Sequence, residues 1–237
     1  TRYGEFYGYI AEGYFQSEEE IKKSPRQMRE LAPGDIKYKD LNDDGVIDAN
    51  DQCYLGKSWF PSWSYGMGFN INYHNFDLAL FFQGVSDVSI MANGGSIDTG
   101  NGDWGASGVG IVPFTGMGLN PSNVITKALD RWTADNPRAD AWYPRMTANA
   151  TTNDNNYVNS THWLKDGSYL RLKQASLGYT LENKKLMDKG IEYLYFYLSG
   201  QNLLTFSKFK LWDPELGSNG AKYPLSRMVT LGMRVSF

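Results

Sequence analysis

Residues 63–82, WSYGMGFNINYHNFDLALFF, decide the fold class of this chain. Apolar side chains recur at every second position of the first half, with Ser, Gly and Asn between them. After His74 and Asn75 the alternation resumes at Phe76, and Phe81 is the one large apolar residue on the polar side. A period of two is that of a β-strand with one apolar and one polar face. The stretch therefore predicts a long antiparallel hairpin closed by a two-residue turn.

Three further segments show the same alternation. They are residues 168–181, residues 191–204 and residues 229–237, the last of which ends the chain. These strands are longer than the common globular length of about 5–6 residues, and they suffice for a tilted membrane crossing of about 9–11 residues. Between two of them, ENKKLMDKG reads as a short polar turn, with room for one helical turn closed by Gly190.

The connections between these strands are unequal in length. Two are short, at 74–75 and 182–190, and two are long, at 87–166 and 205–225. Short turns on one side and long loops on the other are typical of outer-membrane barrels, whose long loops face outward. On this pattern residues 1–62 form an extracellular segment and residues 63–237 form the strands and their loops.

Five strands are too few to close a barrel, because the smallest single-chain barrels have about eight. We therefore expect the C-terminal portion of a larger antiparallel transmembrane β-barrel, an all-β fold. The alternative that the alternation leaves open is a soluble β-sandwich with one decorated loop.

Composition excludes several classes of protein. A mean hydropathy of −0.47, with no apolar run near the length of a membrane helix, excludes a helical membrane protein but not a barrel, whose strands average out as polar. The 23 basic and 26 acidic residues show no basic run, which argues against nucleic acid as a partner. The single Cys53 excludes an internal disulfide framework. No signal peptide opens the chain, so it is cytosolic, mature or internal sequence.

The sharpest local motif is DLNDDGVIDAND at residues 40–51. Oxygen-bearing side chains occupy positions 1, 3, 5, 9 and 12 of this loop, and Gly45 occupies position 6, as in an EF-hand calcium loop. Calcium prefers six to eight oxygen ligands, and a backbone carbonyl at position 7 supplies one of them. The candidate ligands are Asp40, Asn42, Asp44, Val46, Asp48 and Asp51. The flanking residues are typical of strands rather than helices, so a bound Ca²⁺ would be structural; the alternative is an ion-free Asx-rich turn.

No catalytic constellation is apparent. The two histidines, His74 and His162, lie far apart in sequence and belong to no motif. Asp98 and Asp103 lie in a Gly-rich loop that offers nothing apolar to raise a pKa, so an acid–base pair there is not expected. Tryptophans 104, 132, 142, 163 and 212 of the long loops could stack on ligands, but we expect them to pin the loops down.

Several of these motifs together resemble one family. GDIKYKDLNDDGVIDANDQCYLG, followed by FDLALFFQG, SYLRLKQASLGYTL, YLSGQNLLTFSKFKLWDPEL and YPLSRMVTLGMRVSF, resembles the C-terminal barrel region of SusC/RagA-type TonB-dependent outer-membrane transporters of Bacteroidetes. The fold implied is a plugged barrel of about 22 strands, of which this chain supplies the last five. Phe237 resembles the aromatic last residue that the barrel-assembly machinery recognises.

The resemblance implies energy-coupled import across the bacterial outer membrane and no enzymatic activity. The implied partners are a SusD-like surface lipoprotein, TonB acting on a plug absent from this chain, the lipid bilayer and a glycan or peptide ligand. A dimer of such transporter–lipoprotein pairs is the implied assembly. The substrate-binding residues stay unknown, because the motifs that match are structural.

A second hypothesis is a secreted, calcium-stabilised β-sandwich that binds carbohydrate. The two hypotheses differ in what covers the apolar strand face, which carries Leu78, Leu80, Phe82, Val229, Leu231 and Val235. That face meets lipid in a transporter and a protein core in a sandwich.

Overall fold

The computed structural model describes residues 4–93, 126–146, 154–188, 190–218, 220 and 223–237. The chain divides into two compact units, each interrupted in sequence. The first, here called the loop unit, comprises Thr1–Phe60, Val88–Gly167 and Phe209–Tyr223. The second, here called the strand unit, comprises Pro61–Asp87, Ser168–Lys208 and Pro224–Phe237.

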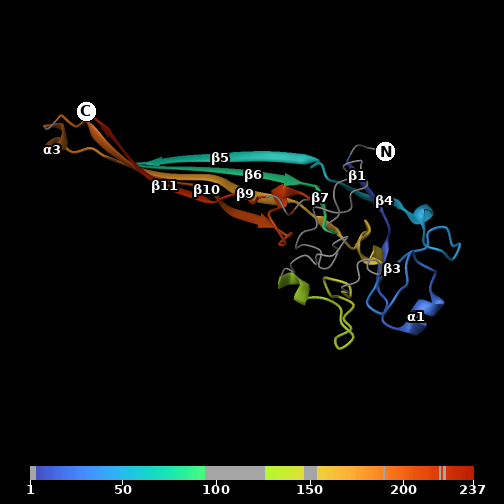
Figure 1. Cartoon of the computed structure of the whole chain (residues 1–237). Coiled ribbons are helices and arrows are strands. Elements are labelled where there is room, and N and C mark those ends of the chain that lie inside the picture. Colours follow the sequence, from blue (N-terminus) through green and yellow to red (C-terminus); the bar gives the residue numbers. More distant parts are fainter. Residues whose placement is uncertain (1–3, 94–125, 147–153, 189, 219, 221–222) are drawn as a thin grey trace. The chain divides into compact units, whose positions relative to one another are not determined.

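The strand unit is one antiparallel sheet of five strands in the order β11-β10-β9-β6-β5 (Figure 1). Its strands are β5 (Trp63–Tyr73), β6 (Phe76–Ser86), β9 (Tyr169–Leu181), β10 (Tyr193–Ser207) and β11 (Met228–Ser236). The predicted hairpin is confirmed, with a left-handed His74 (φ 51°) in the turn between β5 and β6. The sheet remains open within the described residues, with β5 and β11 at its edges.

Strand register gathers the apolar side chains on one face of the sheet. Five paired residues, one from each strand, form the row Ile71, Leu78, Leu177, Leu198 and Leu231. The next row along the strands is Tyr73, Phe76, Tyr179, Phe196 and Met233. Because side chains alternate between faces at every residue, a slip of one position in any pairing would break these rows.

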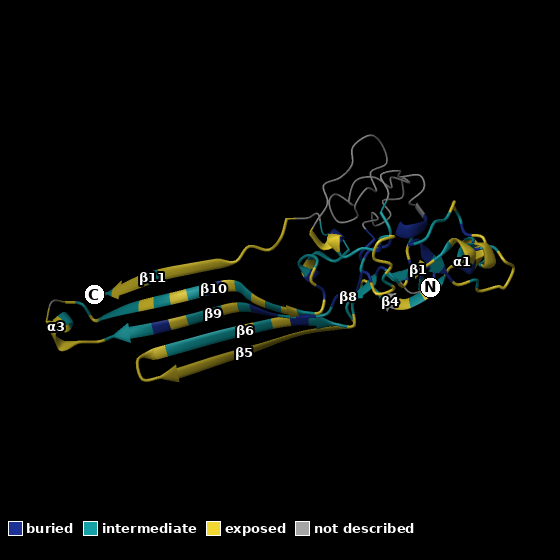
Figure 2. Ribbon diagram, turned by 90° about the horizontal axis from the view of Figure 1, so that it is seen from below, coloured by how far each residue is buried: buried dark blue, intermediate teal, exposed yellow. Residues whose placement is uncertain are grey.

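The opposite face carries mostly glycine and polar residues, together with tyrosines of β10 and with Phe81 of β6. Phe81 projects from the polar face of β6, and its ring lies over two glycines of β5: a Cβ added to Gly66 would be 3.3 Å from Cζ of Phe81, and one added to Gly68 would be 3.8 Å from Cδ2. The ring thus covers backbone that has no side chain of its own. Figure 2 shows that the two edge strands are exposed along most of their length.

The short connection between β9 and β10 contains the single helical turn allowed by the sequence. This is α3 (Lys184–Met187), capped at its N-terminus by the side chain of Asn183, which accepts from the Lys185 amide. Gly190 has a φ of 78° and its amide donates to Met187, which ends the turn as expected of glycine after a helix.

The loop unit consists of small two-stranded sheets and short helices. The sheets pair β1 (Glu5–Gly8) with β4 (Cys53–Ser58), β2 (Ala11–Tyr14) with β3 (Ile36–Tyr38), and β7 (Ser89–Met91) with β8 (Leu164–Asp166). The helices are α1 (Glu18–Lys23), capped by Ser17, and the 3-10 turns η1 (Ala49–Asp51), η2 (Thr126–Leu129), η3 (Asp154–Tyr157) and η4 (Pro214–Leu216). No helix in the described part of the chain is long and apolar enough to span a membrane.

Residues 87–166 were expected as one long loop, but their described part is folded. It contains β7, β8, η2 and η3, and it supplies much of an aromatic core. Trp163 is fully buried in that core; its ring is stacked 5.4 Å from the ring of Tyr157, and the tilted ring of Tyr143 lies 5.8 Å away. Trp132 is buried as well. Aromatic residues widely spaced in the sequence therefore pin this segment down.

A buried polar network ties the distant parts of the loop unit together. Asp35 is fully buried; its carboxylate forms an ion pair with Nε of Arg145 at 2.6 Å and accepts a hydrogen bond from Nη2 of the same guanidinium at 3.0 Å. The side-chain amide of Asn156 also donates to Asp35, at 2.7 Å. Nearby, buried Gln27 bonds through its side chain to the backbone of β3 and to Asn155. The bonds of Asp35 to Arg145 and Asn156, and of Gln27 to Asn155, join residues more than a hundred positions apart.

Replacing Arg145 should therefore destabilise the loop unit. Arg145→Ala leaves the Asp35 carboxylate buried without its cation, a change that costs about 3–5 kcal/mol. The matched control is Lys127→Ala, which removes an exposed ion pair with Asp130 and should cost about 1 kcal/mol or less. Limited proteolysis of the full-length protein measures both, and equal digestion rates for the two variants would contradict the prediction.

Candidate functional site

The backbone of residues 40–51 turns tightly around its own side-chain oxygens, a conformation compatible with both a calcium loop and an ion-free Asx-rich turn. The amide of Gly45 donates to Oδ2 of Asp40 at 2.8 Å, and the amide of Val46 donates to Oδ1 of Asp44 at 2.8 Å. Between them the Asp44 amide donates to Oδ1 of Asn42 at 3.1 Å. Gly45 has a φ of 81°, a conformation that glycine adopts without steric cost. The side chains at loop positions 1, 3 and 5 thus accept from the backbone amides at positions 6, 5 and 7, respectively.

The second half of the loop is closed by two aspartates. Asp48 caps η1 by accepting from the Asn50 amide, and the fully buried Asp51 accepts from the amides of Leu41 and Asp48, each at 2.8 Å. Burial by itself raises the pKa of Asp51, but the backbone donors and its contact with Asp40 outweigh it and hold that pKa below the usual value. Asp51 is therefore a carboxylate at neutral pH.

The donor set partly fits a cation. Oδ1 of Asp40 is buried and accepts no hydrogen bond from the described residues, so one carboxylate oxygen at position 1 is available. The flanking Gly45 carbonyl and Ile47 amide pair with the backbone of Arg26, and the Val46 carbonyl takes no part in that pairing. However, no three His, Cys, Asp or Glu side chains of the described chain gather as a ready metal cluster. Side chains such as the exposed Asp44 would have to turn inward to complete one.

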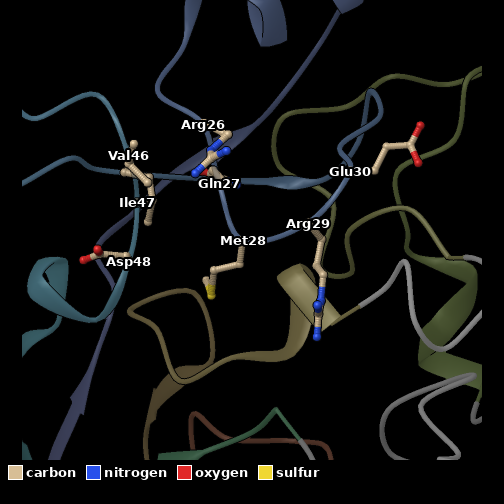
Figure 3. Close-up of a pocket in the computed structure, with 8 residues that line it drawn as sticks. All are labelled: Arg26, Gln27, Met28, Arg29, Glu30, Val46, Ile47 and Asp48. Atoms are coloured by element: carbon tan, nitrogen blue, oxygen red, sulfur yellow. The ribbon is translucent and has the colours of Figure 1, made fainter.

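A solvent-open cavity of about 830 Å³ lies beside this loop (Figure 3). Its lining comes from the segment Arg26–Glu30 and from Val46, Ile47 and Asp48, so Asp48 belongs to both the loop and the cavity wall. Figure 3 shows the two segments running past one another with Met28 and Arg29 projecting from the first. Guanidinium, carboxylate and aliphatic groups all line the cavity, and this mixture selects no single ligand chemistry.

His162 lies in an aromatic cluster of the loop unit. Its Nε2 is 3.2 Å from the carbonyl oxygen of Trp142 and 3.4 Å from the hydroxyl of Tyr14, which itself donates to the Ala141 carbonyl. Burial, with the positive charge of nearby Lys165, lowers the pKa of His162 to about 4, although the Trp142 carbonyl opposes this shift. The ring is thus neutral at physiological pH. Its partners are a carbonyl and a phenol, an arrangement that holds an aromatic core together.

The remaining candidate residues from the sequence do not gather at one site in the described part of the chain. His74 is exposed in the turn between β5 and β6, with its ring 4.4 Å from that of Tyr73. Asp98, Asp103 and Trp104 lie outside the described residues. The Asp35–Arg145 network and the His162 cluster were missed from the sequence, because their members are distant along the chain and share no local pattern.

Two curated proteins are similar to nearly the whole chain. TonB-dependent receptor P26 of Formosa agariphila is 30% identical over 95% of the chain, and TonB-dependent receptor P3 of the same organism is 28% identical over 99%. The chain is a distant homologue of TonB-dependent receptors. It spans only 22% of the length of either relative. No protein-family model matches the sequence.

Solved structures match the same fold. The RagAB peptide importer in its open-open state matches all of this chain, with a TM-score of 0.63 and 22% identity, over 24% of the solved chain. The closed-closed state matches 98% of the chain with a TM-score of 0.61 and 23% identity, over 23% of the solved chain. The five-stranded antiparallel sheet thus matches part of a RagAB chain in fold. The homology is to transport proteins, which are not enzymes.

The loop unit should lose stability as the pH falls. Because the pKa of His162 is about 4 in the fold and about 6.5 in an unfolded chain, the unfolded state binds the extra proton between these values. Stability present above pH 6.5 is therefore lost progressively toward pH 4. His162→Phe should flatten this dependence, whereas His74→Phe, a change at an exposed turn, should leave it unchanged. Thermal unfolding at pH 7.5, 5.5 and 4.5 tests this, and identical profiles for both variants would refute it.

Proposed function

We propose that this chain is the C-terminal portion of a TonB-dependent importer of the bacterial outer membrane. In this proposal the strand unit forms the last five strands of a closed transmembrane barrel of about 22 strands. The loop unit, built from residues 1–60, 88–167 and 209–223, is extracellular. The homology to TonB-dependent receptors and the likeness to RagAB support this proposal.

The observation that carries it is the exposed apolar face of the strand unit. Leu231, Met233 and Ile71 are 79%, 59% and 55% exposed, although each lies in one of the two register-matched rows of apolar side chains. An apolar face of this extent marks a surface that another apolar phase covers. Lipid fits, because the apolar residues alternate with polar ones over strands long enough to cross a bilayer.

The soluble sandwich has no such support in the described residues. A sandwich needs a second sheet to cover the apolar rows, yet the other described sheets have two strands each and belong to the loop unit. The edge strands β5 and β11 likewise each need a further neighbour, since exposed edges of this length are prone to pair with other strands. Strands from the remainder of a longer chain meet both needs.

The partners of the import cycle are also proposals. A SusD-like surface lipoprotein would act with the loop unit, TonB would act through a plug outside this chain, and transporter–lipoprotein pairs would dimerise. The solved structures are of a peptide importer, which favours peptide over glycan as the cargo class to test first. The loop at residues 40–51 would hold a structural Ca²⁺ through Asp40, Asn42, Asp44, Val46, Asp48 and Asp51.

A charge on the apolar face should block assembly into the membrane. Leu231→Arg places a cation among the apolar rows of the outermost described strand, at a cost of about 2–4 kcal/mol if the site lies near the bilayer midplane. Thr230→Arg, one residue away on the polar face, is the matched control and should assemble. Outer-membrane fractionation of cells expressing each full-length variant gives the result. Normal assembly of Leu231→Arg would overturn the proposed orientation.

Calcium should protect the loop unit from protease. Asp40 supplies the buried unpaired oxygen and Asp44 an exposed carboxylate, so the double variant Asp40→Ala and Asp44→Ala should abolish calcium-dependent protection. The control is Asp43→Asn, because Asp43 lies between ligand positions and Asn tolerates its left-handed backbone (φ 57°). Digestion is compared in calcium and in chelator. Wild-type protein that is cut equally in both would contradict a calcium site.

A further inference from the structure

Two tyrosines of β10 lie over glycines of the strands on either side. Tyr197 pairs directly with Gly178 of β9 and Gly232 of β11 on the polar face of the sheet. A Cβ added to Gly232 would lie 2.2 Å from Cζ of Tyr197, so the tyrosine ring occupies the place of a side chain there. Neighbouring Tyr195 leans the other way, toward β9, with its ring stacked 5.9 Å from that of Tyr197.

Tyr195 reaches across a whole strand. Its hydroxyl donates to Oδ2 of Asp77 on β6 at 2.9 Å, although β9 separates β10 from β6. The bond passes over Gly178: a Cβ there would lie 2.2 Å from the tyrosine hydroxyl and 2.4 Å from the Asp77 carboxylate. On its other side Tyr195 has the guanidinium of Arg234 on β11, 5.9 Å from the ring centre. One side chain thus links four adjacent strands.

We propose that Asp77, Gly178 and Tyr195 form a register lock that positions the C-terminal strands before the barrel closes. Backbone hydrogen bonds alone do not distinguish the native pairing from one shifted by two residues, which keeps apolar side chains on the same face. The lock does distinguish them, because only the native register puts a glycine between the carboxylate and the hydroxyl. Replacement of that glycine by any other residue displaces the bond.

The lock lies near the short-turn end of the strands. Asp77 is the second residue of β6, after the turn at His74 and Asn75, and Tyr195 is the third residue of β10, after the turn that contains α3. The β5–β6 and β9–β10 hairpins are local, whereas Asp77 and Tyr195 lie 118 positions apart, so their bond acts when the two hairpins align with each other. Asp77, Gly178 and Tyr195 are thus positioning residues rather than ligand contacts.

The test compares glycine variants of the full-length protein. Gly178→Ala should speed unfolding in denaturant about tenfold, a rate change that corresponds to about 1.4 kcal/mol. Gly68→Ala is the matched control: it lies on the polar face of β5, and its added Cβ would make only ordinary contacts at 3.8 Å. The readout is the loss of the heat-modifiable folded band on gel electrophoresis over time.

A double-mutant cycle keeps the inference falsifiable if Gly178→Ala fails to fold. Asp77→Ala and Tyr195→Phe each remove one partner, so the double variant should unfold no faster than the worse single variant. Tyr195→Phe should also speed unfolding more than Tyr193→Phe, a change on the same face and strand. If the effects of the two single substitutions on the unfolding rate added up in the double variant, the proposed register lock would be wrong. Equal unfolding rates for Gly178→Ala and Gly68→Ala would overturn it as well.

Discussion

Register is the constraint on which the strand unit depends. Its five strands alternate apolar and polar residues, and alternation makes a face only when neighbouring strands are aligned in phase. Ile71, Leu78, Leu177, Leu198 and Leu231 stand in one row because four separate pairings are each in phase. Exposure of such a row to water is unfavourable. The aligned apolar side chains stabilise the protein only where an apolar phase covers this face of the sheet.

The two units are stabilised by different interactions. The strand unit exposes its apolar residues and derives order from backbone pairing and from glycine–aromatic contacts on its polar face. The loop unit buries aromatic side chains such as Trp163 and Tyr143, and joins remote segments through the charged pair of Asp35 and Arg145. A buried charge is costly unless it is paired. The pair of Asp35 and Arg145 therefore favours a single arrangement of the segments that it joins, which have little regular structure.

The strands were predictable from the sequence because their signal is local. Each of the five appears as an alternation of period two, and β5, β6, β9 and β11 begin within one residue of the expected positions. The bulge near Asn202 in β10 was not predictable, since a left-handed asparagine (φ 52°) leaves no mark on the alternation around it. Phe81 broke the pattern for a reason found only in the neighbouring strand, where the residues beneath its ring are glycines.

The loop unit was less predictable, because its order comes from contacts between distant residues. The stretch from Asp40 to Asp51 is an exception, because its side-chain oxygens accept from amides two to five residues away and so carry a local signal. Gln27 is a contrasting case. Its buried side chain bonds to the backbone of β3 as a neighbouring strand would, and the residues around Gln27 in the sequence do not predict this. The central part of the loop then pairs with Arg26, the residue before Gln27. A cation held by the loop would therefore act on the same short segment that anchors β3 to Asn155, and so on the fold of the loop unit as a whole.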